Sequence, residues 1–285
     1  MSWIALRLGR PVARLVLWPI AVYFLFTAAP ARRASRDYLR RALGRPPGLH
    51  EILAHIHHFA ATILDRIYLL NERYDLFDID IEGEPLMAGL AADNRGALLF
   101  GGHLGSFEIT RAIGRLHPAQ RIVLTMYEDN ARKINQTLAA INPAAQPEII
   151  PLGHLDTMLR VRDALAGGAL VGLLADRSLG DEATRAARLL GHPVSIPTGP
   201  FRMAAMLRQP VIFMVGLYLG GNRYRIRFER LADFSQVTPA GRDAAIGAAI
   251  DAYAASLERC CREAPRNWFN FFDFWHRPDP APEQP

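Results

Sequence analysis

One histidine lies in a glycine-rich turn. Residues 98–109, "LLFGGHLGSFEI", are an apolar run that breaks into glycines around His103, and Glu108 follows five positions later at the start of an expected helix. A catalytic base needs access, a group that fixes its tautomer, and donors for a developing oxyanion. Gly102 and Gly105 permit a sharp turn, Glu108 is placed to reach back to the imidazole, and free N–H groups of the turn suit an anion. An ordinary capped turn with a first-turn Glu explains the same pattern, so local chemistry leaves both readings open.

A second strand end carries ionisable residues. In "GLLADRS" (172–178), Asp176 and Arg177 follow an apolar run. Asp176 is either a cap for the next helix or a carboxylate that faces a cleft, with Arg177 available to hold a phosphate or a thioester-carrier group. Sites in open α/β sheets form at the carboxyl ends of strands, so a cleft shared with His103 is plausible.

The elements that position these residues alternate along the chain. Apolar strands are expected at 97–101, 121–127, 148–152, 169–175 and 210–220, with helices at 105–116, 129–141, 154–166 and 198–208. An alternating strand is expected at 76–83 and an edge strand at 223–231, with further helices at 50–70 and 242–263. Strands separated by helices of 10–15 residues predict an α/β fold with a largely parallel central sheet flanked by helices.

The N-terminus is apolar and strongly basic. Residues 1–50 hold nine Arg and one acid, Asp37, and the run 15–30 ("LVLWPIAVYFLFTAAP") has arginines on both sides. The run is marginal in length for a spanning helix. A signal peptide is disfavoured by the arginines that follow it, a short monotopic or barely spanning anchor is favoured, and a buried core helix is the alternative. We therefore divide the chain into an anchor with a basic helix (1–45) and a second domain (46–285).

Composition excludes several classes of protein. The basic residues are concentrated at the N-terminus, which indicates an anionic lipid surface rather than a nucleic acid as partner. The chain has no P-loop, no G-x-S-x-G, no G-x-G-x-x-G and no zinc motif. The histidines in "HEILAHIHH" (50–58) are expected to be partly solvated on an amphipathic helix, and the adjacent cysteines at 260 and 261 make a poor disulfide.

Five blocks, in order, resemble a known family. They are H-x4-E at 103–108, "YEDN" at 127–130, "GLLADRS" at 172–178, "PTGPFRMAAMLRQPVIF" at 197–213 and "APRNWFNFFDFW" at 264–275. Together they resemble the bacterial lipid A biosynthesis (lauroyl/myristoyl) acyltransferases of the lysophospholipid and glycerolipid acyltransferase superfamily. The ending "WFNFFDFWHR" and Phe201 depart from the family pattern, which indicates a divergent branch with a different acceptor.

The resemblance implies a reaction. A fatty acyl group passes from acyl carrier protein or coenzyme A to a hydroxyl or amine of a lipid or glycolipid, at the cytoplasmic face of the bacterial inner membrane, without cofactor or metal. His103 is the expected base, with Glu108 preferred as its partner and Asp176 kept as the alternative. The expected substrate-binding positions are Gly102, Gly105, Asn130, Arg177, Thr198 and Gly199.

Two other functions remain open at this stage. One is a membrane-peripheral lipid-binding protein that has lost catalysis, and the other is a metal-dependent hydrolase that uses the same cleft. The aromatic residues of the C-terminal segment 268–275 either line an acyl tunnel or belong to the core, and aromatic stripes more often mean burial.

Overall fold

The computed structural model describes residues 2–112, 120–127, 132, 136, 138, 141–142, 147–154, 156–177 and 182–275. The α-helices are α1 (Ser2–Thr27), α2 (Ala29–Leu43), α3 (Leu49–Leu70), α4 (Glu84–Ala92), α7 (Thr157–Ala166), α8 (Gly199–Leu207) and α9 (Arg242–Glu263). The strands are β1 (Asp78–Glu82), β2 (Ala97–Gly101), β3 (Ile122–Tyr127), β4 (Glu148–Leu152), β5 (Leu170–Leu174), β6 (Thr184–Leu189), β7 (His192–Pro197), β8 (Pro210–Gly220) and β9 (Arg223–Asp233).

A seven-stranded sheet forms the centre, in the order β1-β9-β8-β2-β5-β3-β4. Neighbouring strands are parallel except at β8–β9, which is an antiparallel pair. This arrangement confirms the predicted α/β class with a largely parallel sheet. The prediction that 223–231 is an edge strand is wrong, because β1 pairs with β9 and forms the edge itself.

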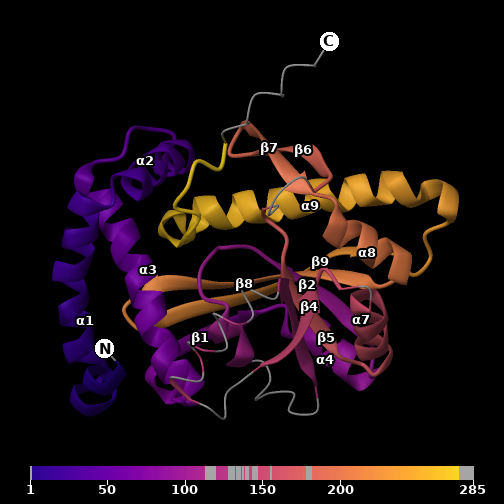
Figure 1. The fold of residues 1–285 in the computed structure, drawn as a ribbon, viewed down its shortest axis with the longest axis horizontal. Coiled ribbons are helices and arrows are strands. Elements are labelled where there is room, and N and C mark those ends of the chain that lie inside the picture. Colours follow the sequence, from indigo (N-terminus) through magenta and orange to yellow (C-terminus); the bar gives the residue numbers. More distant parts are fainter. Residues whose placement is uncertain are drawn as a thin grey trace.

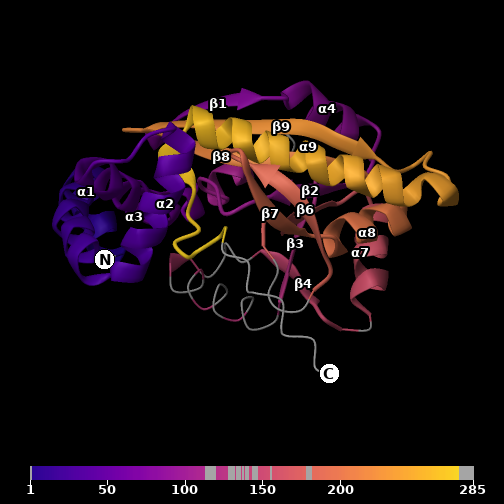
Figure 2. The same cartoon turned by 90° about the horizontal axis from the view of Figure 1, so that it is seen from above.

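Both faces of the sheet are covered, as the unbroken apolar strands predict. In β2, Leu98 and Phe100 face one core, whereas Ala97 and Leu99 face the other. The first core is shared with α7, α8 and α9, and the second with α4 and the C-terminal half of α3. Figures 1 and 2 show α9 crossing the sheet while α1, α2 and α3 stand together at one end. The site therefore sits on a rigid, doubly covered frame.

Helix α1 lies along the body of the protein. One stripe of it is buried, at Ala13, Leu17, Ala21 and Leu25, and these residues occur every fourth position so that they share one helix face. The segment Gly9–Thr27 has the length and apolar composition to cross a membrane, which core helices and signal sequences also show. Residues of α1 and α2 join the same core clusters as the sheet. The domain division at residue 45 stays a prediction.

A buried ion pair fixes α1 to the rest of the chain. The Arg10 guanidinium donates to both carboxylate oxygens of Asp65 on α3, at 2.7 and 2.8 Å, and the Tyr224 hydroxyl donates to the same carboxylate at 2.8 Å. Asp65 is completely buried. A buried carboxylate is tolerated only when its charge is paired and hydrogen-bonded, so this contact specifies how α1 is seated.

Two of the four histidines of α3 are more buried than the sequence predicts. His55 and His57 are buried, which corrects the expectation of partial solvation for them, whereas His50 is exposed and His58 is half-buried. The His55 ring bonds the Ser35 hydroxyl of α2 at 2.8 Å and the backbone carbonyl of Trp268 at 2.6 Å. His55 therefore joins α2 and α3 to the C-terminal segment.

One supersecondary unit was not predicted at all. Strands β6 and β7 form an antiparallel hairpin whose two turn residues, Leu190 and Gly191, have φ of 54° and 80°. Positive φ at both central positions is the turn geometry that suits a two-residue hairpin. "TRAARL" alternates weakly and "HPVSIP" carries two prolines, so neither segment gives a clear strand signal.

Candidate active site

His103 and Asp176 are brought level by strand register. Strand β2 is paired in parallel with β5, and the residue opposite Gly101 is Leu174. His103 and Asp176 each follow two residues later, so both leave the sheet at the same height and on adjacent strands. This is the carboxyl edge at which α/β proteins place ligands. The two strand ends thus lie at one cleft, as the sequence predicts.

The two side chains are hydrogen-bonded. His103 Nδ1 lies 2.9 Å from Asp176 Oδ1 and 3.1 Å from Oδ2, and the His103 backbone N–H donates to Oδ2 at 2.9 Å. The Asn270 amide donates to the same Oδ2 at 2.8 Å. Asp176 is completely buried, whereas a quarter of the His103 side chain is exposed.

The charge on Asp176 fixes the tautomer of the imidazole. Burial on its own raises the pKa of Asp176, but the hydrogen bonds and charge of His103 and the Asn270 amide outweigh burial and leave that pKa below its ordinary value. An ionised carboxylate only accepts hydrogen bonds, so Nδ1 of His103 carries the proton. The lone pair of the neutral ring is then on Nε2, the nitrogen turned away from Asp176.

Glu108 has a different partner. Its Oε1 lies 2.6 Å from Nε of Arg66 on α3, and the Ser106 hydroxyl donates to Oε2 at 3.5 Å. Glu108 is the partner of His103 that the sequence favours; in the structure the carboxylate that contacts the imidazole is Asp176. The expected helix 105–116 does not begin at Gly105. Its described part is a 3-10 turn, Glu108–Ala112, and this later start directs Glu108 towards α3.

The glycine turn is held by backbone contacts on both sides. Gly105 has φ of 70°, and a Cβ there would overlap the carbonyl oxygen of Gly216 on β8. The N–H groups of residues 103–106 donate to Asp176, Gly102, Asn267 and Gly216, respectively. Of the N–H groups expected to serve an oxyanion, those of residues 103–106 are thus engaged within the protein. Gly102 packs its Cα side against Leu257 and Tyr253, where a Cβ would be crowded.

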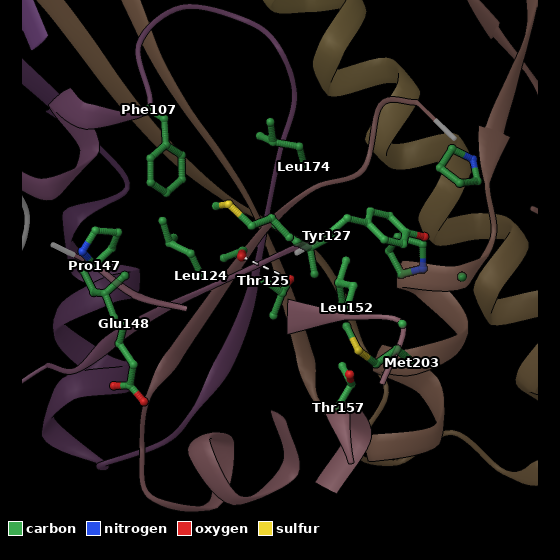
Figure 3. Close-up of a pocket in the computed structure, with 18 of the residues that line it drawn as sticks. Phe107, Leu124, Thr125, Tyr127, Pro147, Glu148, Leu152, Thr157, Leu174 and Met203 are labelled. Atoms are coloured by element: carbon green, nitrogen blue, oxygen red, sulfur yellow. Dashed lines mark hydrogen bonds between the residues drawn. The ribbon is translucent and has the colours of Figure 1, made fainter. Parts of the chain in front are cut away.

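A cavity of about 980 Å³ opens beside His103. Its described lining is mainly apolar, and Figure 3 shows Phe107, Leu124, Leu152, Leu174 and Met203 pointing into it. His103, Arg66, Glu108 and Arg177 also line the cavity. An apolar space with a few convergent polar groups is the usual form of a small-molecule site.

The remaining predicted positions divide into three groups. Arg177 and Gly199 line the cavity, and the Arg177 guanidinium lies 5.6 Å from the centre of the Phe272 ring. The Thr198 hydroxyl donates to the carbonyl of Ala183 at 3.0 Å and so ties α8 to the hairpin. Asn130 lies outside the described residues.

Sequence reasoning missed two residues of the site. Asn270 lies in an aromatic segment, and Arg66 lies on an amphipathic helix, so neither belongs to a recognisable motif. Most aromatic side chains of the same segment pack in or against the core: Trp268 is completely buried and stacks with Tyr38, and Phe271, Phe274 and Trp275 are partly buried against the same core, whereas Phe272 is exposed. None of residues 268–275 is among the described residues that line the cavity.

The described part of the chain contains no group of three or more His, Cys, Asp or Glu side chains suited to a metal ion. Cys260 and Cys261 are free thiols buried in α9.

A largely parallel α/β sheet whose carboxyl edge carries a hydrogen-bonded His–Asp pair beside a mainly apolar cavity has the groups that transfer or hydrolysis of an acyl group requires. The family model of the bacterial lipid A biosynthesis acyltransferases matches residues 3–277. The chain belongs to this family, and it is therefore an acyltransferase that acts on lipids. A search of curated protein sequences gave no match.

Proposed function

We propose that the protein transfers a fatty acyl group from a thioester of acyl carrier protein or coenzyme A to a hydroxyl or amine of a lipid or glycolipid. His103 acts as the general base in this proposal. The observation that carries it is the His103–Asp176 pair, in which a buried carboxylate leaves the Nε2 lone pair free at the wall of a largely apolar cavity.

The proton follows a short path in the proposed reaction. Nε2 of His103 takes the proton from the acceptor hydroxyl or amine while the acceptor atom bonds to the thioester carbonyl carbon. The tetrahedral intermediate then collapses, the carbon–sulfur bond breaks, and the imidazolium returns its proton to the departing thiolate. Asp176 stays ionised throughout and stabilises the imidazolium. No covalent acyl-enzyme is needed.

Two further parts of the cavity have assigned roles. The acyl chain occupies the space between Phe107, Leu124 and Met203, because burial of apolar chain surface is favourable there. Because the N–H groups of residues 103–106 are engaged, the Arg177 guanidinium stabilises the oxyanion. Arg66 is neutralised by Glu108 and is the weaker candidate for this role.

The proposed location is the inner membrane, with the catalytic domain on the cytoplasmic side. The face of α1 opposite its buried stripe exposes Leu15, Trp18, Tyr23 and Phe26. A one-sided apolar face of this kind, beside a basic helix, suits the interface of an anionic bilayer. The acceptor lipid would then reach His103 without leaving the membrane surface.

The reaction is tested with purified protein, a bacterial lipid extract and one of two acyl donors, either acyl-coenzyme A or acylated acyl carrier protein. Thiol release and mass spectrometry of the lipids report the transfer, and we expect His103→Ala to lose at least a hundredfold in rate. Absence of acylated lipid with both donors, or full activity of His103→Ala, overturns the proposal. Activity that a chelator removes would instead identify a metal-dependent hydrolase.

Flotation with phosphatidylglycerol vesicles tests the location. We expect Leu15→Asp to reduce vesicle binding several-fold. Leu159→Asp, which changes a similarly exposed leucine on α7, serves as the matched control and should leave binding unchanged. Equal binding of both variants overturns the proposed membrane face.

A further inference from the structure

Asn270 is the one side chain that reaches Asp176 from the C-terminal segment. It is buried, and its Nδ2 donates to Asp176 Oδ2 at 2.8 Å. The Asn270 Oδ1 atom is buried and has no hydrogen-bond partner among the described residues. A buried amide oxygen without a partner destabilises the fold, and a residue kept only for packing would be apolar. The gain from Asn270 therefore lies in its bond to Asp176.

The same segment also holds the histidine turn. The Phe269 N–H donates to the carbonyl of His103 at 2.7 Å, and the Gly105 N–H donates to the carbonyl of Asn267 at 2.8 Å. Leu104 and Trp268 form an isolated antiparallel bridge between these two contacts. One stretch of four residues thus touches both the base and its carboxylate. Their relative position depends on this stretch as well as on the β2–β5 register.

We propose that Asn270 is a positioning residue for the reaction: its amide fixes the rotamer of Asp176 and helps to keep that carboxylate ionised against His103. The inference rests on the proposed function, because positioning matters only if His103 is the base. Asn270 acts through Asp176 and does not line the cavity.

The physical reason is the lack of water around Asp176. Oδ2 accepts from the His103 backbone N–H and from Asn270, and no solvent reaches this fully buried carboxylate to replace a lost donor. When the Asn270 amide is removed, the donors that remain on the carboxylate are the backbone N–H and Nδ1 of His103, so its rotamer against Nδ1 is held less firmly. A hydrogen bond to a charged group is strong enough for its loss to cost roughly tenfold to hundredfold in rate.

The test compares Asn270→Ala and Asn270→Asp with the wild type. Asn71→Ala is the matched control, because it also removes an amide bond, from Nδ2 to the carbonyl of Ile67 at the end of α3, at a place where it touches no residue of the site. We expect Asn270→Ala to lower kcat at least tenfold per folded molecule with KM within threefold. Asn71→Ala should leave both parameters within twofold.

Asn270→Asp supplies a readout that a purely structural role would not move. The introduced carboxyl would face Asp176 in a buried site, and like charges there keep it protonated at low pH, where its O–H donates as the amide does. Its ionisation at higher pH should then give the pH–rate profile a descending alkaline limb that wild type and Asn270→Ala lack. Among the described residues, the other titratable neighbours of Asp176 are His103, Tyr253 and Cys261; burial raises the pKa of Tyr253 and of Cys261, which keeps both neutral.

Each outcome decides the inference. A kcat for Asn270→Ala within threefold of wild type, a loss that follows only the folded fraction measured by circular dichroism, or an Asn270→Asp profile without the new limb overturns it. If one of these results is obtained while His103→Ala is inactive in the same assay, only the role of Asn270 is refuted and the proposed function stands. If His103→Ala is active, the proposed function fails and the inference fails with it.

Discussion

Replacing Asp176 by Asn should invert the tautomer of His103. The Oδ2 position of Asp176 accepts from the Asn270 amide and from the His103 backbone N–H, and the backbone N–H can only donate. In the Asp176→Asn variant the new carbonyl oxygen must therefore occupy this position. The new NH₂ group then takes the place of Oδ1, which lies 2.9 Å from His103 Nδ1. Because an amide nitrogen cannot accept, Nδ1 must accept and the ring proton moves to Nε2.

The expected fall in kcat of Asp176→Asn follows from this geometry. A proton on Nε2 removes the lone pair from the side of the ring that faces the cavity, so general-base catalysis is lost while the packing is unchanged. General-base catalysis contributes about 10²- to 10⁴-fold, equivalent to roughly 3–5 kcal/mol of transition-state stabilisation. We expect kcat of Asp176→Asn to fall by about a thousandfold, with KM changed less than threefold.

Glu108→Gln is the matched comparison, since it makes the same change of carboxylate to amide at the same cavity. Glu108 pairs with Arg66, and both side chains keep some contact with solvent, so we expect less than a tenfold loss in kcat. Thiol release by the purified variants, with folding checked by circular dichroism, measures both. The reasoning is refuted if Glu108→Gln loses a thousandfold while Asp176→Asn stays within tenfold of wild type.

Three further changes have defined outcomes. Gly105→Ala should lower the free energy of unfolding by about 3 kcal/mol or more, because strain at positive φ adds to the overlap of the new Cβ with the backbone. Gly44 has a similar φ but no atom within 4 Å of a new Cβ, so Gly44→Ala should lower the free energy of unfolding by only about 1 kcal/mol. Thermal unfolding compares the two variants. Leu174→Trp should shift the preference towards shorter acyl chains, measured as kcat/KM across a chain-length series, and an unchanged profile would show that the chain lies elsewhere. Burial lowers the pKa of His55 to about 3 from 6.5, so the unfolded state binds the proton first as pH falls. The free energy of unfolding should therefore decrease from about pH 6.5 towards pH 3 by up to about 1.4 kcal/mol per pH unit. Urea unfolding at several pH values should show that the free energy of unfolding of His55→Gln depends less steeply on pH.

Periodicity predicted β2, β3, β4, β5 and β8 because they are short apolar runs bounded by turn residues, and it predicted β1 and β9 because apolar and polar residues alternate in them. It also predicted that His103 and Asp176 end strands at one edge of a sheet. It did not decide between Asp176 and Glu108, because that depends on which strands are neighbours and on where the next helix starts. Close spacing along the chain favoured Glu108. Pairing of β2 with β5 and the later start at Glu108 favour Asp176 in space.

Two other features could not be predicted from the sequence. The β6–β7 hairpin turns at Leu190, a residue type that does not signal positive φ. Asn270 sits among aromatic residues whose only pattern indicates burial, and its contact with Asp176 spans 94 positions along the chain. A contact of this range follows from the tertiary fold, and no local propensity encodes it.

Hydrogen bonds link the N-terminal helices to the C-terminal segment that contacts the site. Ser35 of α2 bonds His55 of α3, and His55 bonds the carbonyl of Trp268, two residues before Asn270. Helices α2 and α3, which contact the α1 helix that carries the proposed membrane face, are therefore tied to the segment that touches both His103 and Asp176. If binding of α1 to lipid shifts α3 against the sheet, the shift reaches the base through His55. His55→Gln should then weaken any stimulation of acyl transfer by vesicles while leaving the rate with detergent-dispersed acceptor unchanged, and equal stimulation of variant and wild type would contradict this coupling.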